Sequence, residues 1–374
     1  MDRAGFLRRH ADLDSAVSLE FGALDKPVLD PQAPNVHFLD HLDTQALKRK
    51  YEVDPAVDKD RIVTVDYVWS GGGIRDAITD GRRFDLIVAS HVFEHFANPV
   101  QWLLDVRSLL SADGKVFLAL PDRRFTFDMI RRDTSLSEWV GWYLRKIDKP
   151  AAEQIYDHFA HVCHVAADRA WRDPDYRGPE PMFKRVQAID LARSATEEER
   201  YVDAHCSVFT PFGFVELCRE LVTLDLFPYR IVGFAPTEFD DMEFLAILQA
   251  HEAPSASRPG NAELQGMAVA AGYDGPFGGG AFARALETDA ELAQRYRDLV
   301  AKAKEAELKQ RSLHAASFPV LDSKLHHERP GLDDPRIPRQ PADVGPWRRT
   351  LGFCRRWLHR CRGSAPTKSD TSAD

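Results

Sequence analysis

The 374-residue chain has 44% hydrophobic residues, enough for one sizeable core with room for an insertion or a second small unit. Its formal net charge of -9 argues against a nucleic-acid partner, because binding phosphates requires clustered Lys and Arg. The five cysteines form no Cys-x-x-Cys pair, so neither a disulfide framework nor a zinc knuckle is indicated. No stretch reaches the roughly 18 apolar residues of a membrane span, and we expect a cytoplasmic protein.

Short apolar runs alternate with helical patterns from residue 17 to residue 125, which is typical of βαβ units around a mostly parallel sheet. The run FDLIVAS lacks polar alternation, as expected for a strand buried on both faces. The predicted strands are 16–20, 36–40, 61–65, 84–90 and 116–120.

A helix is predicted directly after FDLIVAS. Asn98 can cap it, Pro99 stands at its first position, and Gln101 lies three residues past the cap. Its apolar positions form one stripe, as in a helix that lies on a sheet. We expect Gly114 to end this helix.

Residues 126–204 interrupt the strand pattern with an aromatic, basic and histidine-rich segment. We interpret it as an inserted helical cap that is either substrate-facing or purely packed. Its candidate substrate-facing side chains are Trp139, Trp142, Tyr143 and His158, together with Arg123 just before it. After the cap, Thr210 and Pro211 begin a helix, and YRIVGF and EFLAILQA are two strands that can pair antiparallel at a sheet edge.

Two carboxylates end predicted strands. LEFGA places Glu20 and Gly22 at the carboxyl edge of the sheet, where open α/β folds bind their ligands. Asp40 ends the next strand, where its carboxylate can accept hydrogen bonds from both hydroxyls of a ribose. LEFGA by itself could be a buried strand followed by a turn, but its spacing to Asp40 and to FDLIVAS favours a binding site.

The succession LEFGA, FLDHLD, VDYV, FDLIVASHVFEH and LSADGKVFLALPD resembles class I S-adenosylmethionine-dependent methyltransferases. The resemblance covers residues 16–125 and resumes from HCSVFTPFGFVELC to EFLAILQA. It implies an α/β fold, a Rossmann-like doubly wound, mostly parallel seven-stranded sheet with an antiparallel last strand, plus a helical insertion and a helical C-terminal extension. The implied cofactor is S-adenosylmethionine, bound by a domain of residues 1–125 and 205–250.

The resemblance also implies eight cofactor-binding residues at strand ends. They are Glu20, Gly22 and Ala23 at the methionine end, Asp40 at the ribose, Asp66 and Tyr67 at the adenine, and Ser90 and His91 at the sulfonium. A solvated turn explains Asp66 equally well. The chain departs from the family in its glycine loop, where Leu24 and Lys26 replace the later glycines.

Methyl transfer from a sulfonium is an in-line displacement, so alignment of the reactants can supply most of the catalysis. A hydroxyl acceptor would gain from a general base, for which His95 and His205 near the carboxyl edge are the candidates. A structural hydrogen bond is the alternative role for His205. A helix-start cluster is the alternative for His91, Glu94 and His95.

The inserted segment also spaces Asp157, His161, His164 and Asp168 four, three and four residues apart, on one face of a helix. Such a set could bind a divalent metal. One helix seldom supplies every ligand, however, and charged stripes are usually solvated. We therefore predict no metal site.

The C-terminal part divides into a linker with a charged helix, 251–313, and an irregular tail, 314–374. Within the tail, residues 346–363 contain six Arg and no acidic residue. Apolar residues between the arginines resemble a helix lying on an anionic membrane surface, which would give peripheral contact with the inner membrane face. A disordered basic tail, or one docked on the acidic body, is the alternative.

The predicted function is S-adenosylmethionine-dependent O- or N-methylation of a small molecule or glycan. LEFGALDKPVL resembles bacterial methyltransferases associated with surface-polysaccharide assembly, which suggests a sugar acceptor. The alternative is a non-catalytic, methyltransferase-like binding or scaffold protein that lost tight cofactor binding with its glycines. A nicotinamide-dependent oxidoreductase ranks last, because no G-x-G-x-x-G follows the first strand.

Overall fold

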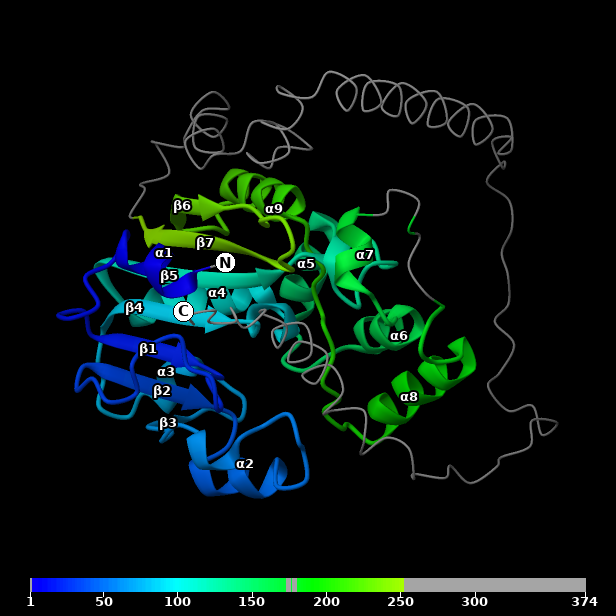
Figure 1. Ribbon diagram of the computed structural model, residues 1–374, viewed down its shortest axis with the longest axis horizontal. Coiled ribbons are helices and arrows are strands. Elements are labelled where there is room, and N and C mark those ends of the chain that lie inside the picture. Colours follow the sequence, from blue (N-terminus) through cyan, green and yellow to red (C-terminus); the bar gives the residue numbers. More distant parts are fainter. Residues whose placement is uncertain (1, 173–175, 177–179, 252–374) are drawn as a thin grey trace, which may run out of the picture. The chain divides into compact units, whose positions relative to one another are not determined.

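The computed structural model describes residues 2–172, 176 and 180–251. Its centre is a seven-stranded sheet with the order β3-β2-β1-β4-β5-β7-β6 (Figure 1). The strands are β1 (Ser18–Phe21), β2 (Val36–Asp40), β3 (Tyr67–Val68), β4 (Phe84–Ser90), β5 (Leu110–Pro121), β6 (Tyr229–Ala235) and β7 (Glu243–Ala250). β7 runs antiparallel to β5 and β6, and the other pairs are parallel. The predicted fold class is thereby confirmed.

Nine α-helices and three short 3-10 turns accompany the sheet in the described part of the chain. The helices are α1 (Arg3–Arg8), α2 (Thr44–Lys50), α3 (Ile74–Ala77), α4 (Pro99–Leu109), α5 (Leu136–Arg145), α6 (Ala152–His161), α7 (Ala167–Arg172), α8 (Arg185–Glu197) and α9 (Pro211–Thr223). The 3-10 turns are η1 (Lys59–Arg61), η2 (Phe93–His95) and η3 (Arg123–Phe125).

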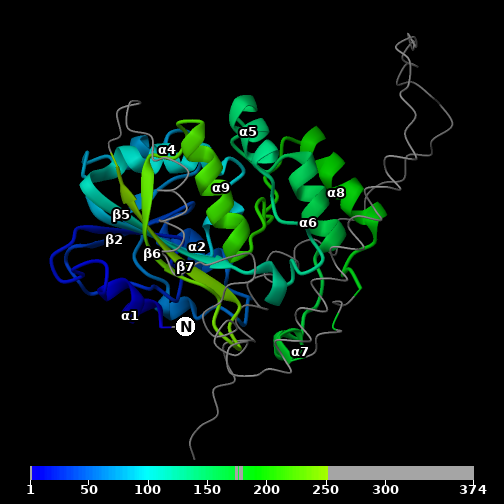
Figure 2. The same cartoon turned by 90° about the horizontal axis from the view of Figure 1, so that it is seen from above.

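One face of the sheet is covered by α4 and α9, with α3 beside α4 (Figure 2). Buried side chains from these helices, such as Leu103 and Phe214, join Phe21 and Leu118 of the strands in the main hydrophobic cluster. Burial of such side chains is worth about 1.5–3 kcal/mol each. This apolar contact explains the stripe that the sequence places on the helix after β4.

The opposite face is covered by the short helix α1 (Figure 2). Phe6 and Leu7 of α1 pack with Leu86 and Phe117 of the strands in a second hydrophobic cluster. In the described structure, residues 22–35 between β1 and β2 follow an irregular path and form no helix. This segment contains three prolines, which lack the backbone N–H that a helix interior needs.

Two predicted boundaries were wrong. The third strand lies at Tyr67–Val68, after the turn η1, and not at residues 61–65. The helix after β4 ends at Leu109, and Gly114 lies inside β5. A Cβ on Gly114 would come within 3.0 Å of the Phe84 carbonyl oxygen, so this glycine permits close strand contact and does not end a helix.

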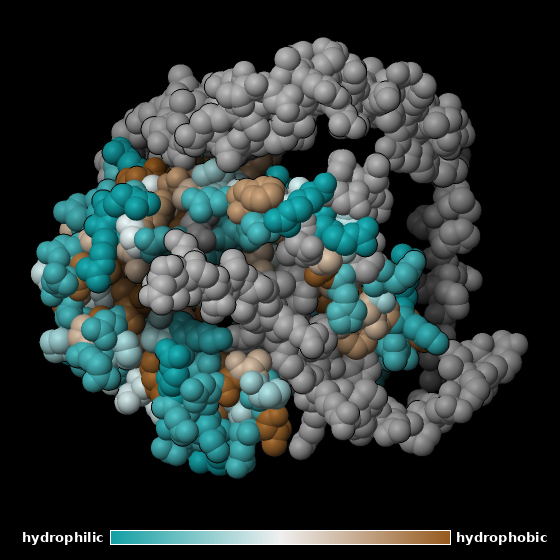
Figure 3. Space-filling model, in the orientation of Figure 1, coloured by the Kyte–Doolittle hydropathy of each residue, from teal (hydrophilic) through white to brown (hydrophobic). Residues whose placement is uncertain are grey.

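The inserted segment carries the helices α5 to α8, which lie beyond the carboxyl ends of the parallel strands (Figure 1). α5 begins with a capping box in which Ser135 and Glu138 satisfy each other's backbone N–H groups. At the other end of the sheet order, α2 buries Leu47 and presents a hydrophilic surface to solvent (Figure 3).

None of the helices in the described residues is long and apolar enough to cross a membrane. The predicted linker and charged helix after residue 251, and the basic segment 346–363, lie outside the described residues.

Candidate functional site

The register of the sheet brings three of the predicted cofactor residues to one level. Phe21 of β1 pairs with Leu39 of β2 and with Ala89 of β4. The residues that follow, Gly22, Asp40 and Ser90, therefore stand side by side at the carboxyl edge. This is the place where an open α/β sheet can bind a ligand.

The loop after β1 has two residues with a positive φ, and only one of them is a glycine. Gly22 has a φ of +59°, and a Cβ there would lie 2.9 Å from the Val92 side chain. Leu24, which replaces the next glycine of the family pattern, also has a positive φ of 54°. A left-handed backbone costs such a residue roughly 1–2 kcal/mol. Burial of the Leu24 side chain against Leu47 offsets that strain.

Glu20 is turned into this loop and away from the open edge. Its carboxylate accepts hydrogen bonds from the backbone N–H groups of Val28 (2.8 Å) and Leu29 (2.9 Å). Burial raises the pKa of Glu20 to about 7, although these two bonds and the charge of Arg3 lower it. The carboxylate therefore organises the loop that begins at Gly22 and Ala23.

Asp40 stands at the edge with its carboxylate covered by its neighbour. Oδ1 accepts from the His41 backbone N–H at 2.7 Å and lies 2.5 Å from His41 Nδ1. The Asp40 side chain is 7% exposed, whereas the His41 side chain is 47% exposed. The predicted contact of Asp40 with a ribose stays a prediction.

Asp66 and Tyr67 have structural partners below the edge. The Asp66 carboxylate accepts a hydrogen bond from the Phe38 N–H at 2.8 Å, which ties β2 to the segment before β3. Tyr67 is 7% exposed and donates to the Asp80 carboxylate at 2.9 Å. Burial raises the pKa of Tyr67 to about 12, with further contributions from Asp80. Their predicted adenine contact stays a prediction.

His91 follows Ser90 in a left-handed conformation, with a φ of 53°. Its Nε2 lies 2.6 Å from the carboxylate of Glu243 at the start of β7, and Arg3 of α1 binds the same carboxylate at 2.7 Å. Burial alone would raise the pKa of Glu243, but His91 and Arg3 hold it well below its usual range. This ion-pair network joins α1, β4 and β7.

The two predicted bases, His95 and His205, come together with Glu94. Their ring centroids are 4.6 Å apart, and Glu94 Oε1 lies 3.9 Å from His205 Nε2. The structure holds each imidazole through Nδ1: Asp203 binds His95 at 2.8 Å, and Asp128 binds His205 at 2.5 Å.

Two buried carboxylates of this cluster, Asp128 and Glu94, have lowered pKa values. Burial alone would raise the pKa of both Asp128 and Glu94. His205 and Arg131 hold the pKa of Asp128 well below its usual range. His91, His205 and His95 likewise lower the pKa of Glu94.

A buried arginine links this cluster to the inserted helices. Arg131 Nη1 binds Asp128 at 2.7 Å, and its Nη2 donates to the His205 carbonyl oxygen at 2.9 Å. The same guanidinium binds Asp157 of α6 through Nε at 2.8 Å. Asp157 and Arg131 line a cavity of about 390 Å³ between the segment 130–138 and α6.

Most side chains proposed as substrate-facing in the inserted cap are in fact packed or paired. Trp139, Trp142 and His158 are at most 3% exposed, and Trp139 donates to Ser207 at 3.0 Å. Arg123 forms an ion pair with Asp133. Trp142 nevertheless lines the 390 Å³ cavity, and Tyr143 packs against the main core.

The predicted stripe of metal ligands in the insertion is not on one helix. α6 ends at His161, so His164 and Asp168 lie beyond the helix that carries Asp157. Asp157 binds Arg131 and His161 instead. Asp157 (45% exposed) and His161 (29% exposed) keep contact with solvent, as expected for a solvated stripe, and are in addition paired with each other.

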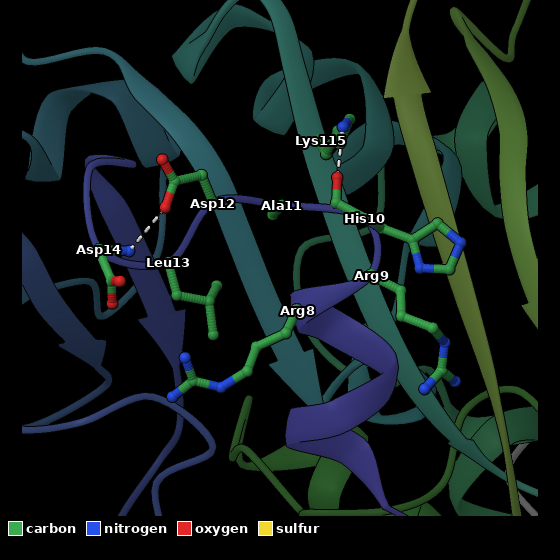
Figure 4. Close-up of a pocket in the computed structure, with 8 residues that line it drawn as sticks. All are labelled: Arg8, Arg9, His10, Ala11, Asp12, Leu13, Asp14 and Lys115. Atoms are coloured by element: carbon green, nitrogen blue, oxygen red, sulfur yellow. Dashed lines mark hydrogen bonds between the residues drawn. The ribbon is translucent and has the colours of Figure 1, made fainter.

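A further hollow lies near the amino ends of the strands, away from these residues (Figure 4). Residues 8–14, between α1 and β1, line it together with Lys115, whose ammonium binds the His10 carbonyl oxygen. Ligands of open α/β sheets bind at the opposite edge, so we do not assign this hollow to the site.

Sequence reasoning named Glu94 beside His91 and His95 but missed three other members of the cluster as functional candidates: Asp128, Arg131 and Asp203. Asp128 and Arg131 follow the strand β5, which is a position where site residues of such folds occur. Nothing in their local pattern distinguishes them from surface charges.

Comparison with known proteins gives the family. A family model described as a methyltransferase domain matches residues 19–220, more than half of the chain. No curated protein matches the chain.

Solved structures resemble the chain distantly. One is the CurJ carbon methyltransferase, with 15% identity over 66% of this chain and 51% of that chain and a TM-score of 0.31. Another is a putative Zn-dependent alcohol dehydrogenase from Rhodobacter sphaeroides, with 14% identity over 67% of this chain and 91% of that chain and a TM-score of 0.36. A putative S-adenosylmethionine-dependent methyltransferase from Listeria monocytogenes also matches (12%, 67% and 98%, 0.32). The chain spans about half the length of the first of these. At such scores the structural matches carry no argument about activity.

Because the family match covers more than half of its length, the chain belongs to this methyltransferase family, with S-adenosylmethionine as its cofactor.

Proposed function

We propose that this methyltransferase transfers the methyl group of S-adenosylmethionine to an oxygen or nitrogen of a polar small molecule or glycan. The observation that carries the proposal is the common level of Gly22, Asp40 and Ser90 at the carboxyl edge. Asp40 would bind the ribose hydroxyls, and the Gly22 backbone would approach the cofactor closely.

The charged cavity beside α6 supports a polar acceptor. It has a volume of about 390 Å³, and its lining includes Arg131, Arg132, Asp133, Glu138, Glu153 and Asp157. Ligand sites of this size bind through a few placed polar groups. Such a lining suits a molecule rich in hydroxyl groups, in line with the sugar acceptor suggested by LEFGALDKPVL.

A base for a hydroxyl acceptor would come from the histidine cluster. The His95 side chain is 21% exposed, whereas that of His205 is 2% exposed. A base must come within hydrogen-bond reach of the proton it removes. His95, oriented by Asp203, is therefore the better placed of the two.

The conformation of Leu24 argues against the alternative of a scaffold that lost its cofactor with its glycines. Leu24 has a left-handed backbone, which glycine adopts readily. A positive φ at this position is therefore compatible with leucine, whose buried side chain supports it.

Calorimetry of the full chain with S-adenosylmethionine tests the proposal. We expect binding that Asp40→Ala abolishes and that Asp113→Ala, an exposed carboxylate in the amino-terminal part of β5, leaves unchanged. Absence of binding at millimolar cofactor would refute the proposed activity.

Mass spectrometry of glycans and small molecules from a deletion strain then identifies the acceptor. We expect the loss of one methyl group, restored by the wild-type gene and not by Asp40→Ala. An unchanged glycan profile together with an altered small molecule would exclude the sugar acceptor.

We also propose peripheral contact with an anionic membrane through residues 346–363, which lie outside the described residues. Co-sedimentation with anionic and neutral vesicles tests it. Binding to anionic vesicles is expected to weaken as salt rises, and equal binding to both kinds would contradict it.

A further inference from the structure

We propose that Glu94, His95 and His205 form a binding site for one divalent transition-metal cation, with Zn²⁺ as the best-fitting ion. One ligand atom from each of these side chains lies within 4.8 Å of the others. Two imidazoles and a carboxylate are a ligand set that Zn²⁺ accepts in proteins. The inference concerns cation binding and does not depend on which acceptor is methylated.

The three side chains come from two segments that the backbone holds together. Glu94 and His95 belong to the turn η2 after β4, and His205 lies in the extended segment before α9. The Glu94 carbonyl oxygen accepts from the N–H groups of Cys206 (2.7 Å) and Ser207 (3.0 Å). The ligand positions are therefore fixed relative to each other before any ion binds.

Each histidine is oriented as metal-bound histidines usually are. Asp203 binds His95 Nδ1, and Asp128 binds His205 Nδ1. A metal-ligating histidine almost always gives its second ring nitrogen to a carboxylate, a carbonyl or water. With Nδ1 engaged in both rings, Nε2 is the ligand atom of each.

Three buried polar atoms of Glu94 and His205 lack hydrogen bonds within the described part of the chain, although His91 Nδ1 lies 3.6 Å from Glu94 Oε1. Among the described residues, neither carboxylate oxygen of Glu94 has a hydrogen-bond partner, and neither does His205 Nε2. Glu94 is 0% exposed and His205 is 1% exposed. A buried polar atom without a partner costs about 1–3 kcal/mol, and more when it is charged. A cation bound by His205 Nε2 and one Glu94 oxygen would give two of these three atoms a partner and leave a fourth coordination position open.

The geometry favours a small ion with few ligands. Zn²⁺ binds nitrogen and oxygen at about 2.0–2.2 Å in a tetrahedron, which places the ligand atoms roughly 3.3 Å apart. The ligand atoms of Glu94, His95 and His205 lie within 4.8 Å of one another, so binding the ion requires their side chains to move closer by on the order of 1 Å. The partly exposed His95 side chain gives an ion access from solvent.

A ligand role and a proton-acceptor role exclude each other for the same nitrogen. If the site binds a cation, His95 and His205 act as ligands, and an open fourth position can bind a solvent molecule or the acceptor itself. The metal content of the purified protein therefore decides between the two roles.

Titration of the EDTA-treated full chain with Zn²⁺ alone, in competition with a chromophoric chelator, tests the inference. We expect Glu94→Gln and His95→Ala each to weaken the binding of one equivalent of Zn²⁺ by at least about 100-fold. Asp203→Asn, which changes a partner of His95 and no ligand, should weaken it between about 10-fold and 100-fold. The matched control is His161→Gln on α6, which should leave the affinity unchanged.

Substitution with Co²⁺ provides an independent readout. A tetrahedral site is expected to give intense visible absorption that His95→Ala removes. Because the side chain of His95 is partly exposed, this variant keeps the test valid even if Glu94→Gln does not fold. Zn²⁺ binding that both ligand variants leave unchanged, or no binding by the wild type, would overturn the inference.

Discussion

Arg131 is held by two carboxylates that differ in burial, which makes a matched pair of substitutions informative. The Asp128 side chain is 2% exposed and binds both Arg131 and His205. The Asp157 side chain binds the same guanidinium but is 45% exposed. We expect Asp128→Asn to lower the free energy of unfolding far more than Asp157→Asn.

The magnitude follows from burial. Removing one partner of a buried ion pair costs about 3–5 kcal/mol, because it leaves the other charge without compensation. Exposed pairs contribute about 0–1 kcal/mol. The loss should depend on pH as well. Because the pKa of Asp128 is depressed, its stabilisation is full above the unfolded pKa of about 3.9 and fades as the pH falls below it.

Urea unfolding of the two variants and the wild type at neutral pH, in the presence of EDTA, measures the difference. EDTA removes any contribution from cation binding. A loss below about 1 kcal/mol for Asp128→Asn, or equal losses for both variants, would refute the assigned role of the buried pair.

Three further predictions concern other parts of the site. Burial raises the pKa of Glu20 to about 7, so protonated Glu20 is favoured in the folded state. The free energy of unfolding of the wild type should therefore fall by on the order of 3 kcal/mol relative to Glu20→Gln as the pH rises from about 4.5 to 7. Urea unfolding measures this difference, and parallel pH profiles of the two proteins would contradict it. Gly22→Ala would place a Cβ at a residue with a positive φ and close to Val92. We expect thermal unfolding to show a free energy of unfolding lower by about 1–2 kcal/mol, together with weaker cofactor binding. Unchanged stability would count against the loop geometry. Burial raises the pKa of three thiols, those of Cys163, Cys206 and Cys218. An alkylating reagent should therefore leave them unmodified in the native protein, as detected by mass spectrometry. Fast modification of any of them would contradict their burial.

The sequence by itself determined the fold class and the carboxyl edge. FDLIVAS, the capped helix after it and the last two strands are local patterns of apolar residues, and local patterns report which faces must be buried. The placement of Asp40 at a strand end follows from the same patterns. Where the local pattern is weak, the predicted position was wrong, as for the two-residue strand Tyr67–Val68.

Only the tertiary structure decided how the polar residues are combined. Glu94, Asp128, Asp203 and His205 are separated by up to 111 residues in sequence, yet they meet in one buried cluster. Whether a carboxylate is solvated or buried depends on segments that pack over it, and no residue's neighbours in sequence carry that information. For the same reason Trp139 and His158 belong to the packed interior, and Leu24 can take the backbone shape of a glycine because its side chain is buried.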